Sequence, residues 1–115
     1  PRNTAEQMAR LASLAADNGL LEVSGVDINT PRQQFNCPEL QRQELAHLND
    51  ATWAMVAHER LAEADLDLGL FAEAGPLASL PLAERIRRYS AVGRSLVAGT
   101  STVGEAAEAL RKGAA

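Results

Sequence analysis

The sequence predicts a small all-α protein, a bundle of four to five helices with a long central helix at about 38–68 and a non-helical arm at about 20–37. Three observations predict this class. Of the 115 residues, 22 are Ala and 16 are Leu, and these two residues are among the strongest helix formers. Aromatic residues, which favour strands, make up only 3% of the chain. Apolar residues outside the arm recur at helical spacing, so we expect residues 1–115 to form a single helical domain.

The first helix is predicted to follow Thr4, because Thr4 and Gln7 have the three-residue spacing of a capping box. Gly19 is a natural end for this helix. One face of the helix is apolar and consists of Met8, Leu11, Ala12 and Ala15. This pattern indicates a helix that packs one side against the rest of the chain.

The stretch from 20 to 37 loses this helical periodicity. Its apolar residues alternate instead, at Leu21 and Val23 and again at Val26 and Ile28. This alternation predicts either an extended arm or a pair of short strands. Unpatterned connections of this length are uncommon within compact domains and are usually functional or disordered.

The central helix is predicted to begin at Pro38, because proline suits the first helical position. The helical pattern continues to about Leu68, with Asn49-Asp50 as a candidate interruption. Prolines and glycines predict a connector at 70–80, which is followed by a helix at 81–99. A second capping box, at Thr102 and Glu105, predicts a last helix at 102–113. The helix at 81–99 should bury one stripe, made of Leu82, Ile86, Tyr89, Gly93, Leu96 and Val97.

Charge and cysteine content argue against several classes of protein. The net charge of -4 argues against a dedicated nucleic-acid binder. No stretch of about 18 apolar residues is present, so the sequence predicts no membrane span. A lone cysteine, Cys37, forms no internal disulfide and fits a reducing compartment. The sequence starts without the pattern of a secretory signal, so we expect a cytoplasmic protein, and no motif predicts a cofactor.

Ionisable residues interrupt the apolar face of the central helix. His58 and Asp65 fall near the middle of that face. His47 joins them if the helix is continuous, and Glu44 lies one turn before it. Because buried ionisable groups are costly unless they are paired, this line of residues predicts either a satisfied polar network or a site.

Three interpretations compete for these four residues. Glu44 and His47 have the Glu-x-x-His spacing of di-iron carboxylate bundles, but such a site needs a second motif and two more carboxylates. A metal site would therefore have to form across a dimer. His47 and His58 lie about 16 Å apart along a continuous helix and cannot share an ion. A catalytic pair of His and carboxylate is the second interpretation, and we favour the third, structural or interface histidines.

Two further motifs have ordinary structural explanations. Cys37 lies at a predicted helix N-terminus, which activates thiols, but a small hydrophobic residue is the favoured interpretation. Asp65, Asp67 and Gly69 match part of a calcium-binding loop that lacks its closing Glu, so an acidic helix end is favoured.

Basic residues are concentrated in the helix at 81–99, at Arg85, Arg87, Arg88 and Arg94. Three of them are predicted on its solvent side, where they could contact phosphate or an acidic protein. The segment Thr102–Leu110 resembles the first helix of helix-turn-helix DNA readers, but the recognition helix that such a reader needs does not follow it. A solvated arginine face and a capped Ala-rich helix are therefore favoured over DNA binding.

The leading prediction is a non-enzymatic protein-interaction or assembly subunit, which forms a homo-oligomer or docks on a larger protein, such as a phage or bacterial assembly. No complete catalytic motif is present, and the arm suits pairing with a neighbour. The predicted interaction residues are Leu21, Val23, Val26, Ile28, Phe35, Trp53 and Val56. The alternatives are a small helical metal-binding protein or enzyme, which would use Glu44, His47, His58 and Asp65, and a small DNA-binding regulator.

Overall fold

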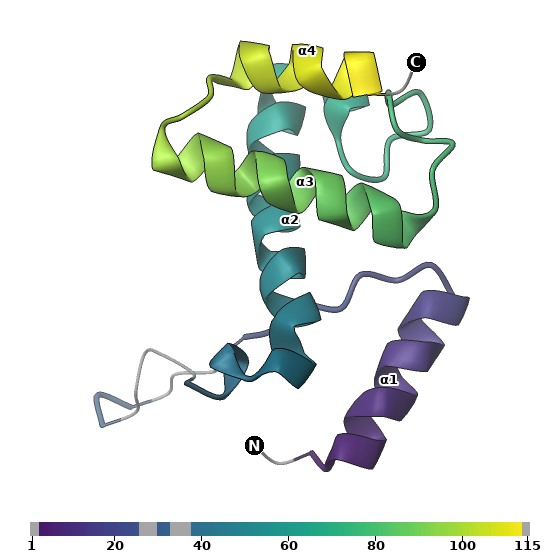
Figure 1. Cartoon of the computed structure of the whole chain (residues 1–115), viewed down its shortest axis with the longest axis vertical. Coiled ribbons are helices and arrows are strands. Elements are labelled where there is room, and N and C mark those ends of the chain that lie inside the picture. Colours follow the sequence, from purple (N-terminus) through teal and green to yellow (C-terminus); the bar gives the residue numbers. More distant parts are fainter. Residues whose placement is uncertain (1–2, 26–29, 33–37, 114–115) are drawn as a thin grey trace. The chain divides into compact units, whose positions relative to one another are not determined.

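The computed structural model describes residues 3–25, 30–32 and 38–113 (Figure 1). The predicted all-α class is confirmed, and these residues contain no strand. The four α-helices are α1 (Ala5–Asp17), α2 (Ala46–Ala64), α3 (Leu82–Ala98) and α4 (Val103–Gly113). Three short 3-10 helices complete the fold, namely η1 (Pro38–Gln41), η2 (Gln43–Leu45) and η3 (Leu66–Leu68).

Contacts divide the chain into two compact units, Pro1–Asn49 and Asp50–Ala115, and the boundary falls within α2. The N-terminal unit contains α1, η1, η2 and the first turn of α2. The C-terminal unit contains the rest of α2 together with η3, α3 and α4. None of the helices in the described residues is long and apolar enough to cross a lipid bilayer.

Helix α1 begins where its sequence predicts. The Thr4 hydroxyl accepts a hydrogen bond from the backbone N–H of Gln7, and the Gln7 side chain accepts one from the backbone N–H of Thr4. These two bonds complete the predicted capping box and satisfy N–H groups that a helix end leaves without partners. Beyond α1, the described parts of the predicted arm, 20–25 and 30–32, are neither helical nor extended into a strand.

The central helix is shorter than the sequence predicts, because 3-10 turns replace both of its ends. The backbone of Arg42 is extended (φ -68°, ψ 139°), which separates η1 from η2, so that α2 begins only at Ala46. At the other end the backbone of Asp65 is extended (φ -157°, ψ 118°), and the Asp65 side chain caps η3 by accepting a hydrogen bond from the Asp67 N–H. The predicted helix at 38–68 is therefore corrected to 46–64.

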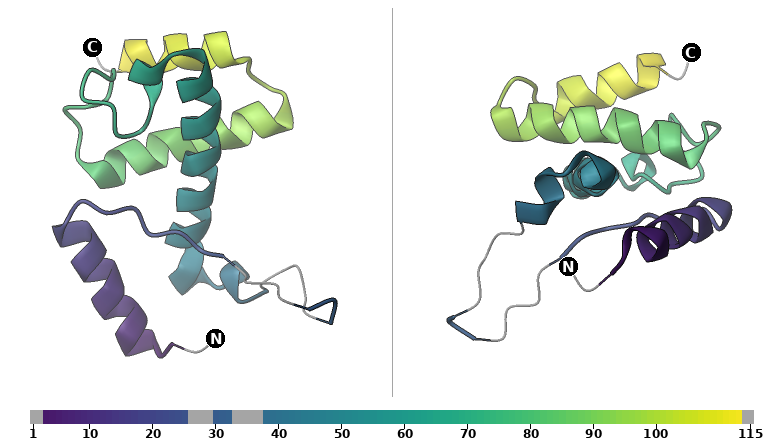
Figure 2. Two further views of the ribbon diagram at one scale, coloured as in Figure 1. Left: turned by 180° about the vertical axis from the view of Figure 1, so that it is seen from behind. Right: turned by 60° about the horizontal axis from the view of Figure 1, so that its bottom comes forward.

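The C-terminal unit has a closely packed core. Figure 2 shows α3 crossing α2 and α4 lying alongside α3. The crossing depends on Gly93, because a Cβ atom there would overlap the backbone carbonyl of Trp53. The predicted stripe of α3 is buried at Tyr89, Gly93 and Leu96, whereas Val97 at its C-terminal end is 58% exposed and is a correction to that stripe.

The connector between η3 and α3 is held by side chains of α3. Arg85 donates hydrogen bonds to the backbone carbonyls of Leu70 (2.9 Å) and Leu80 (3.1 Å). The buried hydroxyl of Tyr89 donates a hydrogen bond of 2.6 Å to the carbonyl of Leu68. Burial raises the pKa of the Tyr89 phenol above its ordinary value, while the positive charge of Arg85 acts in the opposite direction. The connector is therefore part of the folded core, although it contains no α-helix.

Candidate functional site

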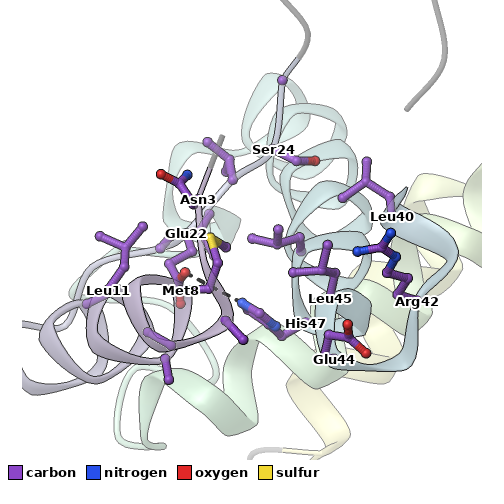
Figure 3. A pocket seen from close by; sticks show the side chains of 18 of the residues that line it. Asn3, Met8, Leu11, Glu22, Ser24, Leu40, Arg42, Glu44, Leu45 and His47 are labelled. Carbon is purple, nitrogen blue, oxygen red and sulfur yellow. Dashed lines mark ion pairs between the residues drawn. The ribbon is translucent and has the colours of Figure 1, made fainter. Parts of the chain in front are cut away.

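An apolar groove lies within the N-terminal unit (Figure 3). One wall is the predicted apolar face of α1, and Met8, Leu11 and Ala15 are among its residues. The segment 20–25 and the residues around η1, η2 and the start of α2 form the rest of the lining. The cavity volume is about 820 Å³. The groove is partly open to solvent, and its volume falls within the range of surface clefts that bind ligands.

A carboxylate and an imidazole meet within this groove. Nε2 of His47, in the first turn of α2, lies 3.5 Å from Oε2 of Glu22, and Figure 3 marks this pair with a dashed line. The Glu22 side chain is only 15% exposed, whereas that of His47 is 42% exposed. Oε2 of Glu22 is buried and accepts no hydrogen bond from the described residues. An acceptor in this state is costly, so a donor that reached this carboxylate would stabilise the unit.

His58 has a different role within the C-terminal unit. Its Nδ1 accepts a hydrogen bond of 2.9 Å from the backbone N–H of Leu70. The acceptor role of Nδ1 places the ring proton of the neutral tautomer on Nε2. The imidazole also packs so closely on Gly69 that a Cβ atom there would lie 3.1 Å from its Cε1. The side chain therefore ties α2 to the connector.

Three of the four residues proposed as a metal or catalytic site, His47, His58 and Asp65, have separate partners. Asp65 is exposed, caps η3 and lies 3.8 Å from Nη2 of Arg111. Glu44 belongs to η2 and lines the groove near His47, as Figure 3 shows. Within the described residues, no group of three or more His, Cys, Asp or Glu side chains could hold a metal ion. Cys37 lies outside those residues.

The predicted interaction residues fall into three groups. Leu21 is half-buried and Val23 is exposed, and both line the groove. Trp53 and Val56 are half-buried in the C-terminal unit, where the guanidinium of Arg94 lies 5.8 Å from the centre of the Trp53 ring. This contact of a cation with an aromatic face gives Trp53 a partner inside its own unit. Val26, Ile28 and Phe35 lie outside the described residues.

Sequence reasoning missed two of the exposed apolar side chains of the N-terminal unit, Leu14 and Leu20, and the partly buried carboxylate of Glu22. Leu14 is 51% exposed and Leu20 is 61% exposed, beside Leu11 (50%) and Val23 (57%). The sequence did contain a signal for Leu14. Because Leu14 follows Leu11 by three residues, the two side chains lie side by side at the edge of the apolar face of α1. No pattern in the sequence distinguishes Glu22 from an ordinary solvated carboxylate.

The arginines of α3 already have partners within the C-terminal unit. Arg87 and Arg88 both pair with Glu84, and Arg94 pairs with Asp50 at 3.0 Å. Arg85 is used by the connector rather than by solvent. These two carboxylates, Glu84 and Asp50, offset half of the positive charge of the four arginines. The segment Thr102–Leu110 forms most of α4, and its capping box forms as predicted.

Comparisons of the chain with models of protein families, with curated proteins and with solved structures found no significant match.

Proposed function

We propose that the protein is a non-enzymatic interaction or assembly subunit that associates through the N-terminal unit. The supporting observation is the set of four large apolar side chains that this unit exposes, Leu11, Leu14, Leu20 and Val23. Three of them also line the groove. Soluble proteins rarely expose adjoining apolar side chains of this size, and where they do, the patch commonly marks an interaction site. Burial of one such side chain contributes about 1.5–3 kcal/mol.

Exposed apolar residues elsewhere in the described chain support this assignment by contrast. Leu66, Phe71 and Val97 are also exposed, but Leu66 belongs to η3, Phe71 to the connector and Val97 to the end of α3. None of them is among the residues that line the groove of the N-terminal unit. Single exposed apolar side chains are normal on protein surfaces and need no partner.

Photo-cross-linking in cells that make the protein tests this proposal. A photoreactive phenylalanine analogue is placed at position 14 or, as the matched control, at position 66, where Leu66 is 82% exposed. We expect protein adducts from position 14, whether to another copy or to a different protein, and few from position 66. Equal yields from the two positions, or none from position 14, would contradict the proposal.

A further inference from the structure

We infer that His58 makes the attachment of the connector to α2 sensitive to pH. The neutral imidazole holds the connector, which joins η3 to α3, and the protonated imidazole releases it. This inference concerns the C-terminal unit and is independent of the proposed function. It rests on one hydrogen bond, on the packing around that bond and on the charges that face it.

The hydrogen bond between Leu70 and His58 requires a neutral ring. The backbone N–H of Leu70 donates to Nδ1 of His58 at 2.9 Å, so Nδ1 must offer its lone pair. A protonated imidazole carries a hydrogen on both ring nitrogens, and two donors would then face each other. Leu70 is only 2% exposed, so its N–H group has little access to water. Proton uptake by His58 therefore breaks the bond and leaves a buried donor without an acceptor, which is costly.

The packing around the ring makes this bond difficult to replace. The imidazole lies against Gly69, where a Cβ atom would be 3.1 Å from Cε1 and 3.3 Å from Nδ1 of His58. The connector itself therefore covers the edge of the ring that carries Nδ1. The carbonyl of Leu70 accepts a hydrogen bond of 2.9 Å from Arg85. Leu70 is thus held from α2 by His58 and from α3 by Arg85, and loss of the first bond frees the α2 side of the connector.

The groups on α2 and α3 that face His58 do not favour a positive charge on its ring. The residues three and four positions away on α2 are all apolar, namely Ala54, Met55, Leu61 and Ala62. On α3, the guanidinium of Arg85 bonds to the same residue that donates to His58, and a like charge nearby disfavours protonation. The Tyr89 hydroxyl bonds to the carbonyl of Leu68 and is neutral at acidic pH.

The acidic residues of η3 are not paired with His58. The carboxylate of Asp65 accepts a hydrogen bond from the Asp67 N–H and lies 3.8 Å from Nη2 of Arg111 on α4. Asp67 is exposed. None of the ion pairs within the described part of the chain includes His58. The imidazolium would therefore lose a hydrogen bond without gaining a carboxylate.

The direction of the pH effect follows from this difference between the folded and unfolded chain. Histidine in an unfolded chain takes up a proton below about pH 6.5, whereas the folded unit resists a proton at His58. The unfolded state then binds more protons, so stability falls as the pH falls through this range. Leu70 and Leu77 belong to the connector and are 2% and 1% exposed. Release of the connector at acidic pH therefore uncovers apolar side chains of the core.

The test compares histidine with asparagine at position 58, in a chain whose other histidine is removed by His47→Asn. Asparagine offers a carbonyl oxygen close to the position of Nδ1 and has a similar helix propensity, but it does not titrate. Urea denaturation at pH ~7.5 and pH ~5.5 is followed by the fluorescence of Trp53, which lies in the same unit. Between these pH values, we expect the equilibrium constant for unfolding to rise roughly five- to tenfold more with His58 than with His58→Asn.

A second measurement needs no substitution and decides the question if His58→Asn does not fold. In NMR spectra of the unaltered chain, the backbone amide signal of Leu70 should change with the same pH midpoint as the ring signals of His58. The amide signal of Gly104 in α4 is the control and should not follow that midpoint. An equal pH dependence of the two chains in urea, or a His58 ring that titrates while the Leu70 amide signal stays in place, would overturn the inference.

Discussion

The two units of this chain bury their apolar side chains to very different extents. In the C-terminal unit, Leu61, Leu77 and Tyr89 are almost completely buried, and side-chain hydrogen bonds fasten the connector to the helices. In the N-terminal unit, the only buried apolar residues among those described are Ala15 and Leu48. Local stability follows the density of buried apolar contacts, so the C-terminal unit should hold its fold unaided, whereas the N-terminal unit gains from a partner.

The largest effect is expected from truncating a core leucine. Leu61 is fully buried in α2, so Leu61→Ala should lower the free energy of unfolding by about 2–5 kcal/mol through lost contacts and a residual cavity. Leu14→Ala is the matched variant in the N-terminal unit and should cost less than about 1 kcal/mol, since Leu14 is half exposed. Urea denaturation at a concentration where the chain is monomeric measures both. Similar losses for the two variants would remove the distinction between the units.

A substitution at the crossing of α2 and α3 should lower the free energy of unfolding by somewhat less than Leu61→Ala does. A Cβ atom at Gly93 would overlap the Trp53 carbonyl, and backbone cannot move aside as a flexible side chain can. Gly93→Ala should therefore cost about 1–3 kcal/mol. Gly104→Ala in α4 meets nothing closer than 4.0 Å and should be neutral or slightly stabilising, because alanine favours helix. Thermal unfolding of the two variants compares them, and an unchanged midpoint for Gly93→Ala would show that the helices do not cross this closely.

Replacing His58 should lower the free energy of unfolding more than replacing His47, because only His58 bonds to the connector. His58→Ala removes the acceptor of the buried Leu70 N–H and should cost about 1–3 kcal/mol. His47→Ala alters a side chain that is 42% exposed and should change the free energy of unfolding by less than about 1 kcal/mol. Chemical denaturation checks both variants. A loss for His47→Ala as large as that for His58→Ala would place more of the fold's stability in the N-terminal unit than its burial indicates.

The smallest effect concerns Tyr89 and is expected mainly at alkaline pH. Because burial raises the pKa of its phenol in the folded chain, the protonated form contributes stability that is fully present below the unfolded pKa of about 10 and is lost as the pH rises through the folded value. Tyr89→Phe should cost about 1 kcal/mol at neutral pH, where it loses the hydrogen bond to Leu68, and should lose stability less steeply above pH ~10. Chemical denaturation as a function of pH measures the free energy of unfolding of both proteins. An equally steep loss of stability above pH ~10 in the two proteins would contradict the prediction.

Local signals account for the parts of the fold that the sequence predicted well. Both capping boxes consist of residues three positions apart, and the left-handed backbone of Gly99 (φ 74°) ends α3 as predicted. The shortened central helix was not predictable in this way. The extended backbones of Arg42 and Asp65 break an apolar pattern that continues across them. Arginine does not mark a break by itself, whereas Asp65 is a favourable cap and belongs to the predicted acidic helix end.

The groove was predicted only in part. Helical periodicity identified the face of α1 that lines it, and alternation in the arm identified Leu21 and Val23. The burial of Glu22 and its approach to His47 bring together residues 25 positions apart, a tertiary effect that periodicity does not encode. The line of ionisable residues along the central helix proved misleading, because Asp65 lies beyond the end of α2 and His58 bonds to the connector.

Hydrogen exchange of the full chain over a range of concentrations tests most directly the claim that the N-terminal unit is completed by association. We predict that amides of α1 exchange quickly in dilute solution and become protected as the chain associates. The amides of α2 beyond Asp50 and of α3 should be strongly protected at every concentration. Protection of α1 equal to that of α3 in the dilute monomer, with no dependence on concentration, would contradict this account.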